Sequence, residues 1–540
     1  MKTIHTVFLA AMLMAAVPAV AQDAERDHMG TSCTSILVGK KASADGSVIT
    51  SHTCDSRYRT WMVMAPAKDY PRDTVTAIYR GRYHTQTAQD STKMYVTGVI
   101  PQARHTFRFL DTAYPCLNEK QLAMGETTIG GRDTLRNKKG MFMIEELSRI
   151  ALERCTTARE AIRLMGRLVK DYGYGDNGEC LTIADKNEAW IFEVFGEGPT
   201  KVGGVWAAAR IPDDEVTVSA NISRIGRLDL KDSDRYMASD NVFDVAKRLK
   251  LWDGKEPFCF WKAYSGENYL HEKKNYSIRE HYILSRLVPS LNLSDTVENL
   301  PLSIKPDKPV SAEDVMRLLA SYYEGSPLDL SGRHKIPNLK RKDKAGNLVA
   351  NEPDSIVSPK ANPWYQTDER NMYYAMGDSA WKWTRTVSVP WCSYSTVIQL
   401  RSWLPDEIGG VAWMCFDNPG QSPRFPIFAG CTDLPAVMKV CGQYADRDDA
   451  VLWRFRKANR LATVSWGKYR KTLEPARDYF IEKGFRELPF VEQQWQRLNS
   501  EDPKKAQRML NGYTGDFLGA ELLKWDEMAR DFWLKTWTGF

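Results

Sequence analysis

The stretch CTSILVGKKASADGSVITSHTCD, residues 33–55, decides how the whole chain is interpreted. Its segments TSILVG, at residues 34–39, and SVITSHT, at residues 47–53, are rich in β-branched side chains and predict two strands. The polar turn between them contains Asp-Gly at positions 45–46, a strong hairpin signal. The sequence therefore predicts a β-hairpin that carries Cys33 at its open end.

Residues 1–21 have the pattern of a secretory signal peptide. Lys2 gives a positive start, residues 6–17 are apolar, and an Ala-Val-Ala sequence offers small side chains for cleavage. We therefore expect an exported protein, either periplasmic or extracellular. Eleven mostly polar residues, 22–32, would still precede Cys33, whereas a lipid-attachment cysteine would directly follow the apolar stretch.

The composition is typical of a globular protein. Of the 540 residues, 43% are hydrophobic, and 74 basic against 68 acidic residues leave a net charge of +6. The chain has neither zinc-spaced C-x-x-C pairs nor basic runs interleaved with aromatics, so no nucleic-acid partner is implied. No later apolar run reaches the roughly 18 residues that suggest a membrane span. The ten cysteines are scattered, so their spacing predicts no disulfide pairing.

Hydrophobic periodicity predicts the elements after the first hairpin. Apolar residues recur at helical spacing over residues 141–172, with a break at Thr156-Thr157, which predicts two packed helices. Pairs of alternating apolar segments with turns between them predict three more hairpins, at residues 180–195, 205–221 and 393–417.

The C-terminal part and the overall arrangement follow from the same patterns. Residues 446–540 are charged and helical in period, and the polar segment 338–359 predicts a long exposed loop. Strand clusters separated by paired helices fit two antiparallel sheets between helical layers. We therefore expect an α+β fold, a four-layer αββα sandwich with additional C-terminal helices, in one domain over residues 33–540.

Cys33 would become a strong nucleophile if it were the N-terminal residue. A cysteine attacks as the thiolate and needs a base to form it. A free α-amine has a pKa of about 7.7 to 8.0 and can take the thiol proton near neutral pH. This mechanism requires a second cut, between Ser32 and Cys33, which makes residues 22–32 a propeptide. Attack of the Cys33 thiol on the preceding carbonyl is a plausible route to that cut.

Several separated motifs resemble one known family. Residues 33–55 are similar to the N-terminus of the dipeptidase A and secernin family, which are cysteine-type N-terminal-nucleophile (Ntn) hydrolases related to penicillin V acylase and bile salt hydrolase. The resemblance continues in LNEKQLAMGETTIGGR (117–132), VSANISRIG (218–226), WTRTVSVPWCSYSTVIQL (383–400) and LPDEIGGVAWMCFDNPGQSPRFPIFAG (404–430). The resemblance implies the Ntn-hydrolase fold and a reaction without metal or organic cofactor.

The resemblance also implies roles for individual residues. Cys33 would be the nucleophile and, through its α-amine, the base. Asp55 would hold that amine and tune its pKa. Asn118 and Asn221 match two asparagines beside the reacting carbonyl, where amide donors would stabilise the tetrahedral oxyanion. The match at Asn118 is partial, because Gln121 stands where the related motif has glycine.

Three further residues are weaker candidates for substrate binding. His52 stands where the acylase branch has an arginine. Glu126 would bind the free amine of a substrate, or else serve as a loop carboxylate bonded to nearby amides. Arg224 follows Asn221 by three residues and would point to the opposite face of an extended strand, which favours a structural role.

The leading hypothesis is hydrolysis of dipeptides or short peptides through a thioester on Cys33, with a small peptide as the partner. An N-acyl amidase of the acylase or bile-salt-hydrolase type is the alternative enzyme. A secreted binding protein that keeps the fold without catalysis is the alternative outside enzymes. The sequence leaves homo-oligomer formation open.

Overall fold

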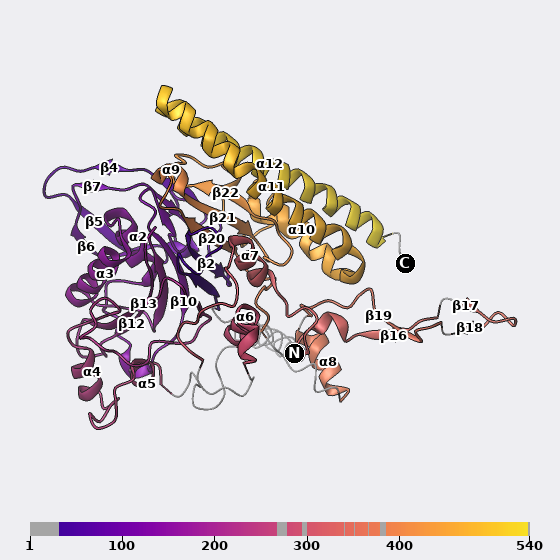
Figure 1. The fold of residues 1–540 in the computed structure, drawn as a ribbon, viewed down its shortest axis with the longest axis horizontal. Helices are drawn as coiled ribbons and strands as arrows, with labels where there is room; N and C mark the ends of the chain where they lie inside the picture. The colour runs from indigo at the N-terminus through magenta and orange to yellow at the C-terminus, as the bar shows by residue number, and fades with distance from the viewer. Residues whose placement is uncertain are drawn as a thin grey trace, which may run out of the picture.

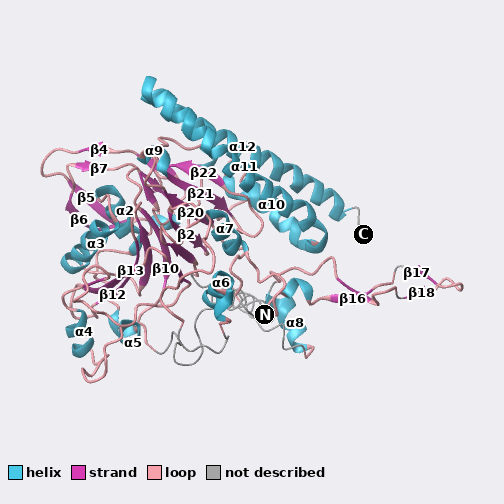
Figure 2. Cartoon of the chain, in the orientation of Figure 1, coloured by secondary structure: helices cyan, strands magenta, loops and turns pink. Residues whose placement is uncertain are grey.

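The computed structural model describes residues 32–266, 278–293, 300–339, 341–349, 351–365, 367–377 and 385–537. The predicted signal peptide, and all of the predicted propeptide except Ser32, lie outside the described residues. The described chain is a mixed α+β protein with eleven helices, α2 to α12, and two large antiparallel sheets (Figures 1 and 2).

The first large sheet has six strands and contains the predicted hairpin. Its order is β14 (Val216–Ser219), β1 (Ser35–Val38), β2 (Val48–Cys54), β20 (Tyr394–Leu400), β21 (Gly410–Phe416) and β22 (Phe425–Phe428). Strands β1 and β2 pair antiparallel, with Leu37 opposite Thr50, as the sequence predicts. The predicted pair at residues 393–417 is also confirmed, because β20 pairs with β21.

The second large sheet has eight strands. Its order is β15 (Tyr236–Ala238), β13 (Gly204–Ile211), β12 (Ala189–Gly196), β11 (Glu179–Ala184), β10 (Ala123–Thr128), β9 (Leu117–Asn118), β8 (Phe109–Asp111) and β3 (Val63–Ala65). The predicted hairpin at residues 180–195 is confirmed as β11 and β12. The two large sheets contact each other where β2 meets β10 and β11.

The hairpin predicted over residues 205–221 is wrong. Strand β13 pairs with β12 and β15, whereas β14 pairs with β1 in the other sheet. The polar turn between them therefore carries the chain from one sheet to the other, and it packs on the turn after β1, where the Gly39 amide donates to the Glu215 carbonyl at 3.0 Å. Alternating strands with a polar turn do not specify their partners, and here the free edge of β1 decides the pairing.

The predicted helix pair is α2 (Ile144–Arg154) and α3 (Ala158–Tyr172). The break falls at Thr157, whose side chain and that of Glu160 form a capping box at the start of α3. Helix α2 contacts β8 and β9, and α3 contacts β12 and β13. Both helices therefore pack on the eight-stranded sheet.

The remaining large helices lie on the six-stranded sheet. The predicted C-terminal helices are α10 (Val451–Val464), α11 (Trp466–Glu501) and α12 (Pro503–Trp537), which contact β21 and β22. Helix α6 (Ile278–Leu287) contacts β14, and α7 (Ala312–Ala320) contacts β2 and β20. Buried apolar side chains from both sheets and from the C-terminal helices form one continuous core.

Short elements complete the chain. They are α4 (Val242–Arg248), α5 (Phe260–Tyr264), α8 (Thr367–Ala375), α9 (Asp406–Gly409), the pair β4 (Lys68–Asp69) and β7 (His105–Thr106), and the pair β5 (Val75–Arg80) and β6 (Tyr95–Pro101). The predicted exposed loop is an arm that projects from the body in Figure 1. It contains β16 (Lys335–Pro337), β17 (Arg341–Lys342), β18 (Leu348–Val349) and β19 (Ser355–Val357).

The structure also bears on the cysteines and on membrane-spanning segments. All ten cysteines lie among the described residues, and none forms a disulfide. Within the described ranges, no helix combines the length and apolarity required to cross a membrane.

Candidate active site

Cys33 is buried immediately before β1, and both of its backbone polar groups are bonded to distant residues. Its side chain and backbone are only 1% exposed. Its amide N–H donates to Asn221 Oδ1 at 3.0 Å, and its carbonyl accepts from Arg279 Nη1 at 2.7 Å. These bonds fix the backbone at the position where a mature N-terminus would begin.

Asn221 reaches Cys33 because β14 pairs with β1, with Ser219 opposite Ser35. It adopts a left-handed backbone with φ of 67°, a conformation that asparagine tolerates better than most residues. Its Oδ1 accepts from the Cys33 amide and from Arg279 Nη2, the latter at 2.8 Å, while its Nδ2 donates to the Thr128 carbonyl at 2.7 Å. The structure therefore brings Asn221 to Cys33, with its side-chain carbonyl oxygen facing the backbone nitrogen of Cys33.

The thiol faces a buried carboxylate from the opposite sheet. Glu126, on β10, places Oε2 3.5 Å from Cys33 Sγ and 3.4 Å from His52 Nε2. His52 lies on β2 between the rings of Tyr114 and Tyr394, each at a centroid distance of 5.7 Å. Contact between β2 and β10 thus brings two predicted substrate-binding residues to the predicted nucleophile, Cys33. Glu126 is a strand residue and not a loop carboxylate.

Two carboxyl groups share this buried region and differ in charge. Burial raises the pKa of Glu126, but hydrogen bonds from His52 and Glu179 outweigh it and leave this pKa below its usual value. The pKa of Glu179 is well above its usual value, because the group is buried beside the Glu126 charge. Glu126 is therefore the anion and Glu179 the neutral acid of the pair.

The Cys33 thiol is neutral in this environment. Burial raises its pKa well above the usual value, and the charge of Glu126 is the next cause. The backbone N–H of Asp55 opposes this rise. A thiolate at Cys33 therefore needs a base that removes the proton during attack.

Asp55 follows β2, and only one of its two carboxylate oxygens accepts a hydrogen bond from a nitrogen or oxygen donor of the described residues. Its Oδ2 accepts from Thr53 Oγ1 at 2.7 Å and from Arg385 Nη2 at 2.5 Å. Its Oδ1 is buried and receives no nitrogen or oxygen donor from the described residues, although the Cys392 thiol lies beside the carboxylate. A buried carboxylate oxygen that receives no nitrogen or oxygen donor is free to accept from an α-ammonium group, which is the role that the resemblance implies for Asp55.

Two buried arginines at the site were not identified from the sequence. Arg279, on α6, donates to Cys33 O, Thr34 Oγ1, Ala220 O and Asn221 Oδ1. Burial, followed by the nearby charge of Arg385, lowers its pKa to about 9. Arg385 binds Asp55 and the residue before the nucleophile, Ser32. Arg385 lies in the quoted motif WTRTVSV, which was the one available signal, whereas Arg279 lies in no quoted motif.

Asn118 does not join the cluster around Cys33. Its Nδ2 donates to the carbonyls of Leu152 and Cys155, both at 2.9 Å, and its Oδ1 accepts from the backbone amides of Lys120 and Leu122. Both amide hydrogens are thus used to tie the turn after β9 to the end of α2. In this structure Asn118 has no hydrogen left for an oxyanion, contrary to the role that the resemblance implies.

Arg224, a weaker candidate for substrate binding, makes the structural contacts that its position three residues after Asn221 favours. Its Nη1 lies 3.2 Å from Glu280 Oε2, and its Nη2 donates to the Leu300 carbonyl at 3.0 Å. Glu280 also accepts from the Ala220 amide at 3.0 Å. The pair therefore anchors α6, which carries Arg279, to the segment that carries Asn221.

The cluster also has the chemistry of a metal site. One ligand atom each from Cys33, His52 and Glu126 lies within 4.8 Å of the others. Thiolate, imidazole and carboxylate are the ligands that zinc accepts in proteins. These three residues could therefore hold a thiophilic divalent cation.

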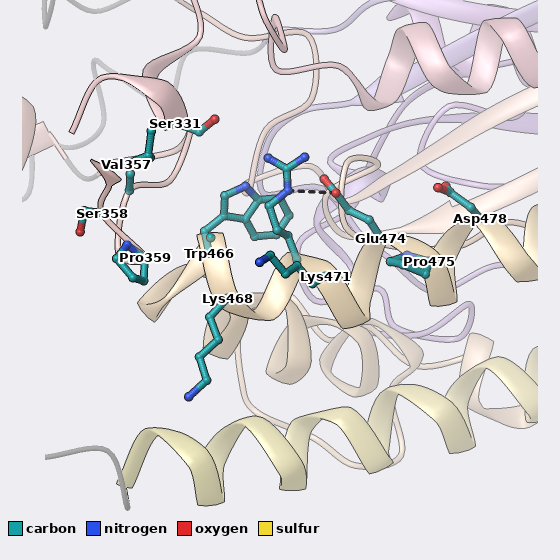
Figure 3. A pocket seen from close by; sticks show the side chains of 13 residues that line it. Ser331, Val357, Ser358, Pro359, Trp466, Lys468, Lys471, Glu474, Pro475 and Asp478 are labelled. Atoms are coloured by element: carbon teal, nitrogen blue, oxygen red, sulfur yellow. Dashed lines mark hydrogen bonds and ion pairs between the residues drawn. The ribbon is translucent and has the colours of Figure 1, made fainter. Parts of the chain in front are cut away.

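A cavity of about 820 Å³ lies elsewhere, at the start of α11 (Figure 3). Its lining includes Trp466, Lys468, Lys471 and the Arg470–Glu474 ion pair, whose Nε–Oε2 distance is 3.0 Å. None of the residues that contact Cys33 lines it. The candidate active site is therefore identified by its side chains and not by this cavity.

Comparison with known proteins finds relatives over most of the chain. The model of Peptidase family C69 matches residues 32–479. A probable dipeptidase of Latilactobacillus sakei is 25% identical over 419 residues, which cover 75% of each chain. A probable dipeptidase of Salmonella dublin is 26% identical over 413 residues, 74% of this chain and 81% of the relative. Dipeptidase A of Lactobacillus helveticus is 22% identical over 452 residues, 81% of this chain and 83% of the relative.

The family match extends over most of the chain and starts one residue before Cys33. It contains the nucleophile candidate together with Glu126, Asn221, Arg279 and Arg385. This chain belongs to peptidase family C69 and is a hydrolase.

Proposed function

We propose that this protein is an exported dipeptidase whose nucleophile is Cys33, exposed as the N-terminal residue when residues 1–32 are removed. The observation that carries the proposal is the position of Cys33, whose amide nitrogen faces Asn221 Oδ1 at 3.0 Å and whose thiol faces Glu126 at 3.5 Å. The start of the family match at Ser32 supports a functional chain that begins at Cys33.

The proposed fold is the four-layer αββα sandwich of Ntn hydrolases. Supporting contacts join β2 to β10 between the sheets, α3 to the eight-stranded sheet, and α12 to the six-stranded sheet. In such an arrangement the N-terminal strand lies at the interface of the two sheets. The contact of Cys33, which precedes β1, with Glu126 on β10 agrees with that placement.

In the mature enzyme the amide nitrogen of Cys33 becomes a free amine at the same place. Asn221 Oδ1 and the spare Oδ1 of Asp55 are acceptors suited to orient it. The amine, with an unperturbed pKa of about 7.7 to 8.0, takes the thiol proton as Sγ attacks the substrate carbonyl. It then protonates the leaving amine and activates the water that hydrolyses the thioester.

The proposal of a dipeptide substrate rests on the names of the relatives and on the negative charge of Glu126. The similar proteins are named dipeptidases. A substrate with a free α-ammonium group requires a carboxylate near the reacting carbon, and Glu126 is an anion 3.5 Å from the nucleophile. An N-acyl amidase would need an apolar surface at that place, so the charge of Glu126 favours the dipeptide.

Export is proposed from the pattern of residues 1–21 alone. N-terminal sequencing of the secreted or periplasmic protein should give Cys33 as the first residue. An active enzyme that begins at Gln22 would contradict the N-terminal-nucleophile mechanism.

The substrate class is tested with matched peptides. Free dipeptides should be hydrolysed and their N-acetylated forms should not, and Cys33→Ala should abolish the activity. Cys33→Ser is the matched control, since it keeps the shape and should retain only a small fraction of the rate. Faster hydrolysis of the N-acetylated peptides would replace the dipeptidase by the amidase.

A further inference from the structure

The peptide bond before the nucleophile is itself in contact with a buried cation. Arg385 Nη2 lies 3.3 Å from the carbonyl oxygen of Ser32, the oxygen of the bond that must be cut to release Cys33. Nη2 and Nε also donate to Ser32 Oγ at 3.2 and 3.3 Å. One guanidinium group therefore holds both the carbonyl and the side chain of the residue that leaves.

Arg385 is held rigidly for this contact. Its Nη2 donates to Asp55 Oδ2 at 2.5 Å, and its Nη1 donates to the carbonyls of Thr386 and Val387. The side chain is only 8% exposed. A donor that is fixed before the reaction stabilises developing charge without reorganisation, which is what an oxyanion site requires.

The second buried arginine, Arg279, contacts Cys33 at its carbonyl group. Arg279 donates to the Cys33 carbonyl, to Thr34 and to the Ala220–Asn221 segment, and none of these bonds reaches Ser32. Among the described contacts, Arg385 donates to both the carbonyl oxygen and the side chain of Ser32.

We infer that Arg385 is a catalytic residue of self-processing, which stabilises negative charge on the Ser32 carbonyl oxygen while Cys33 cuts the bond before it. The inference rests on the proposed function, since it assumes that Cys33 becomes the N-terminus. It assigns the cut to this chain and identifies a donor separate from those that hold the mature amine.

The reaction balances with groups already present. Before cleavage the nitrogen of Cys33 is an amide and cannot act as a base, so the Glu126 carboxylate, 3.5 Å from Sγ, accepts the thiol proton. Sγ bonds to the Ser32 carbonyl carbon, and the oxyanion forms at the Arg385 N–H groups. The C–N bond then breaks, Glu126 returns the proton to the departing nitrogen, and a Ser32–Cys33 thioester remains. Water hydrolyses it to the Ser32 carboxylic acid and the free thiol.

The test follows leader removal in the full chain made by cell-free translation with purified components, using intact mass over time. Wild type is compared with Arg385→Gln and Arg385→Lys. Arg424→Gln is the matched control, because Arg424 is also buried but bonds to Ser395 and Trp413 and not to Ser32. Loss of one oxyanion donor typically slows a reaction by about 10²–10³-fold, so Arg385→Gln should slow the cut by at least about tenfold.

Hydroxylamine distinguishes formation of the thioester from its hydrolysis. It cleaves thioesters, and in wild type it should release a leader that ends in a Ser32 hydroxamate. Arg385→Gln should release little, because its block precedes the thioester, whereas Arg385→Lys, which keeps the charge, should be intermediate. Circular dichroism and melting temperature show which variants fold, and a misfolded Gln variant leaves the Lys variant to decide.

The outcomes distinguish the inference from the function on which it rests. Cleavage of Arg385→Gln and Arg385→Lys at the wild-type rate would overturn the role of Arg385 and leave the Cys33 mechanism intact. A hydroxylamine-sensitive thioester that accumulates in Arg385→Gln would also overturn it, because the arginine would then act after the attack. Wild-type chain that stays uncut here, although the protein isolated from cells begins at Cys33, would overturn self-processing. An active cellular protein with the leader attached would overturn the proposed function itself.

Discussion

The side-chain oxygen of Asn221 lies 3.0 Å from the backbone nitrogen of Cys33, although 188 positions separate the two residues in the chain. The contact depends on the antiparallel pairing of β14 with β1, which brings the ends of the two strands together. It is the contact that would locate the α-amine of the mature enzyme.

Replacing Asn221 should therefore reduce catalysis more than stability. Asn221→Gly removes the acceptor but suits the left-handed backbone with φ of 67°, whereas Asn221→Ala removes the acceptor and adds backbone strain. We expect both variants to lose about 10²-fold in kcat/KM, the scale of a lost active-site contact. Only Asn221→Ala should also lower the melting temperature clearly. Activity in Asn221→Gly close to wild type would show that the side chain only stabilises the turn.

The charge of Glu126 should control the acidity of the nucleophile. Since this anion is the largest electrostatic cause of the raised Cys33 thiol pKa after burial, Glu126→Gln should lower that pKa. The rate of alkylation of Cys33 by iodoacetamide, followed by mass spectrometry across pH, should then rise at lower pH than in wild-type mature enzyme. Processing should become slower because its proton acceptor is lost, and hydrolysis of free dipeptides should become slower because the carboxylate that faces the substrate ammonium group is lost.

Glu179→Gln is the control for that measurement. Glu179 is already neutral beside Glu126, so its replacement removes no charge and should leave the alkylation profile nearly unchanged. A Glu126→Gln profile displaced toward higher pH would contradict the assignment of the negative charge to Glu126.

Zinc should inhibit the mature enzyme through the Cys33, His52 and Glu126 side chains, whose ligand atoms lie within 4.8 Å of one another. Inhibition should be reversed by a chelator, and His52→Phe should weaken it by removing one ligand. The comparison is the zinc concentration that halves activity in wild type and in the variant. Equal values would mean that zinc binds the thiol without the imidazole.

Local signals in the sequence predicted the helices and strands well, whereas the pairing of strands far apart in the chain depends on long-range contacts. The hairpin of β1 and β2 and the helix break at Thr157 depend on residues that are close together in the sequence, so they could be predicted. The partner of β14 could not, because its pairing depends on the edge of β1 in another part of the chain.

The same division applies to the site. Cys33, Asp55 and Asn221 could be predicted as candidate site residues because each lies in a recognisable motif. Asn118 also matched a motif, but its amide is used by the carbonyls of Leu152 and Cys155, which no motif reveals. Arg279 lies 246 positions from Cys33, and only the packing of α6 on β14 brings it to the nucleophile.

Glu193 should make the fold less stable as the pH rises from about 4.5 to about 7. This carboxyl group on β12 accepts hydrogen bonds from Ser223, Arg224 and Ile225, in the segment just after Asn221. Burial raises its pKa to about 7, against an unfolded value near 4.5. The folded state therefore holds a proton that the unfolded state has released between these two values. Stability from this group is complete below about pH 4.5 and is lost progressively up to about pH 7.

Glu193→Gln tests this dependence, because the amide has the shape of the protonated acid and does not titrate. The free energy of unfolding, measured by urea denaturation at pH 5 and pH 8, should fall more in wild type than in the variant, by about 3 kcal/mol at most for a shift of this size. A wild type that gains stability relative to Glu193→Gln as the pH rises would show that the carboxylate is the favoured form in the fold.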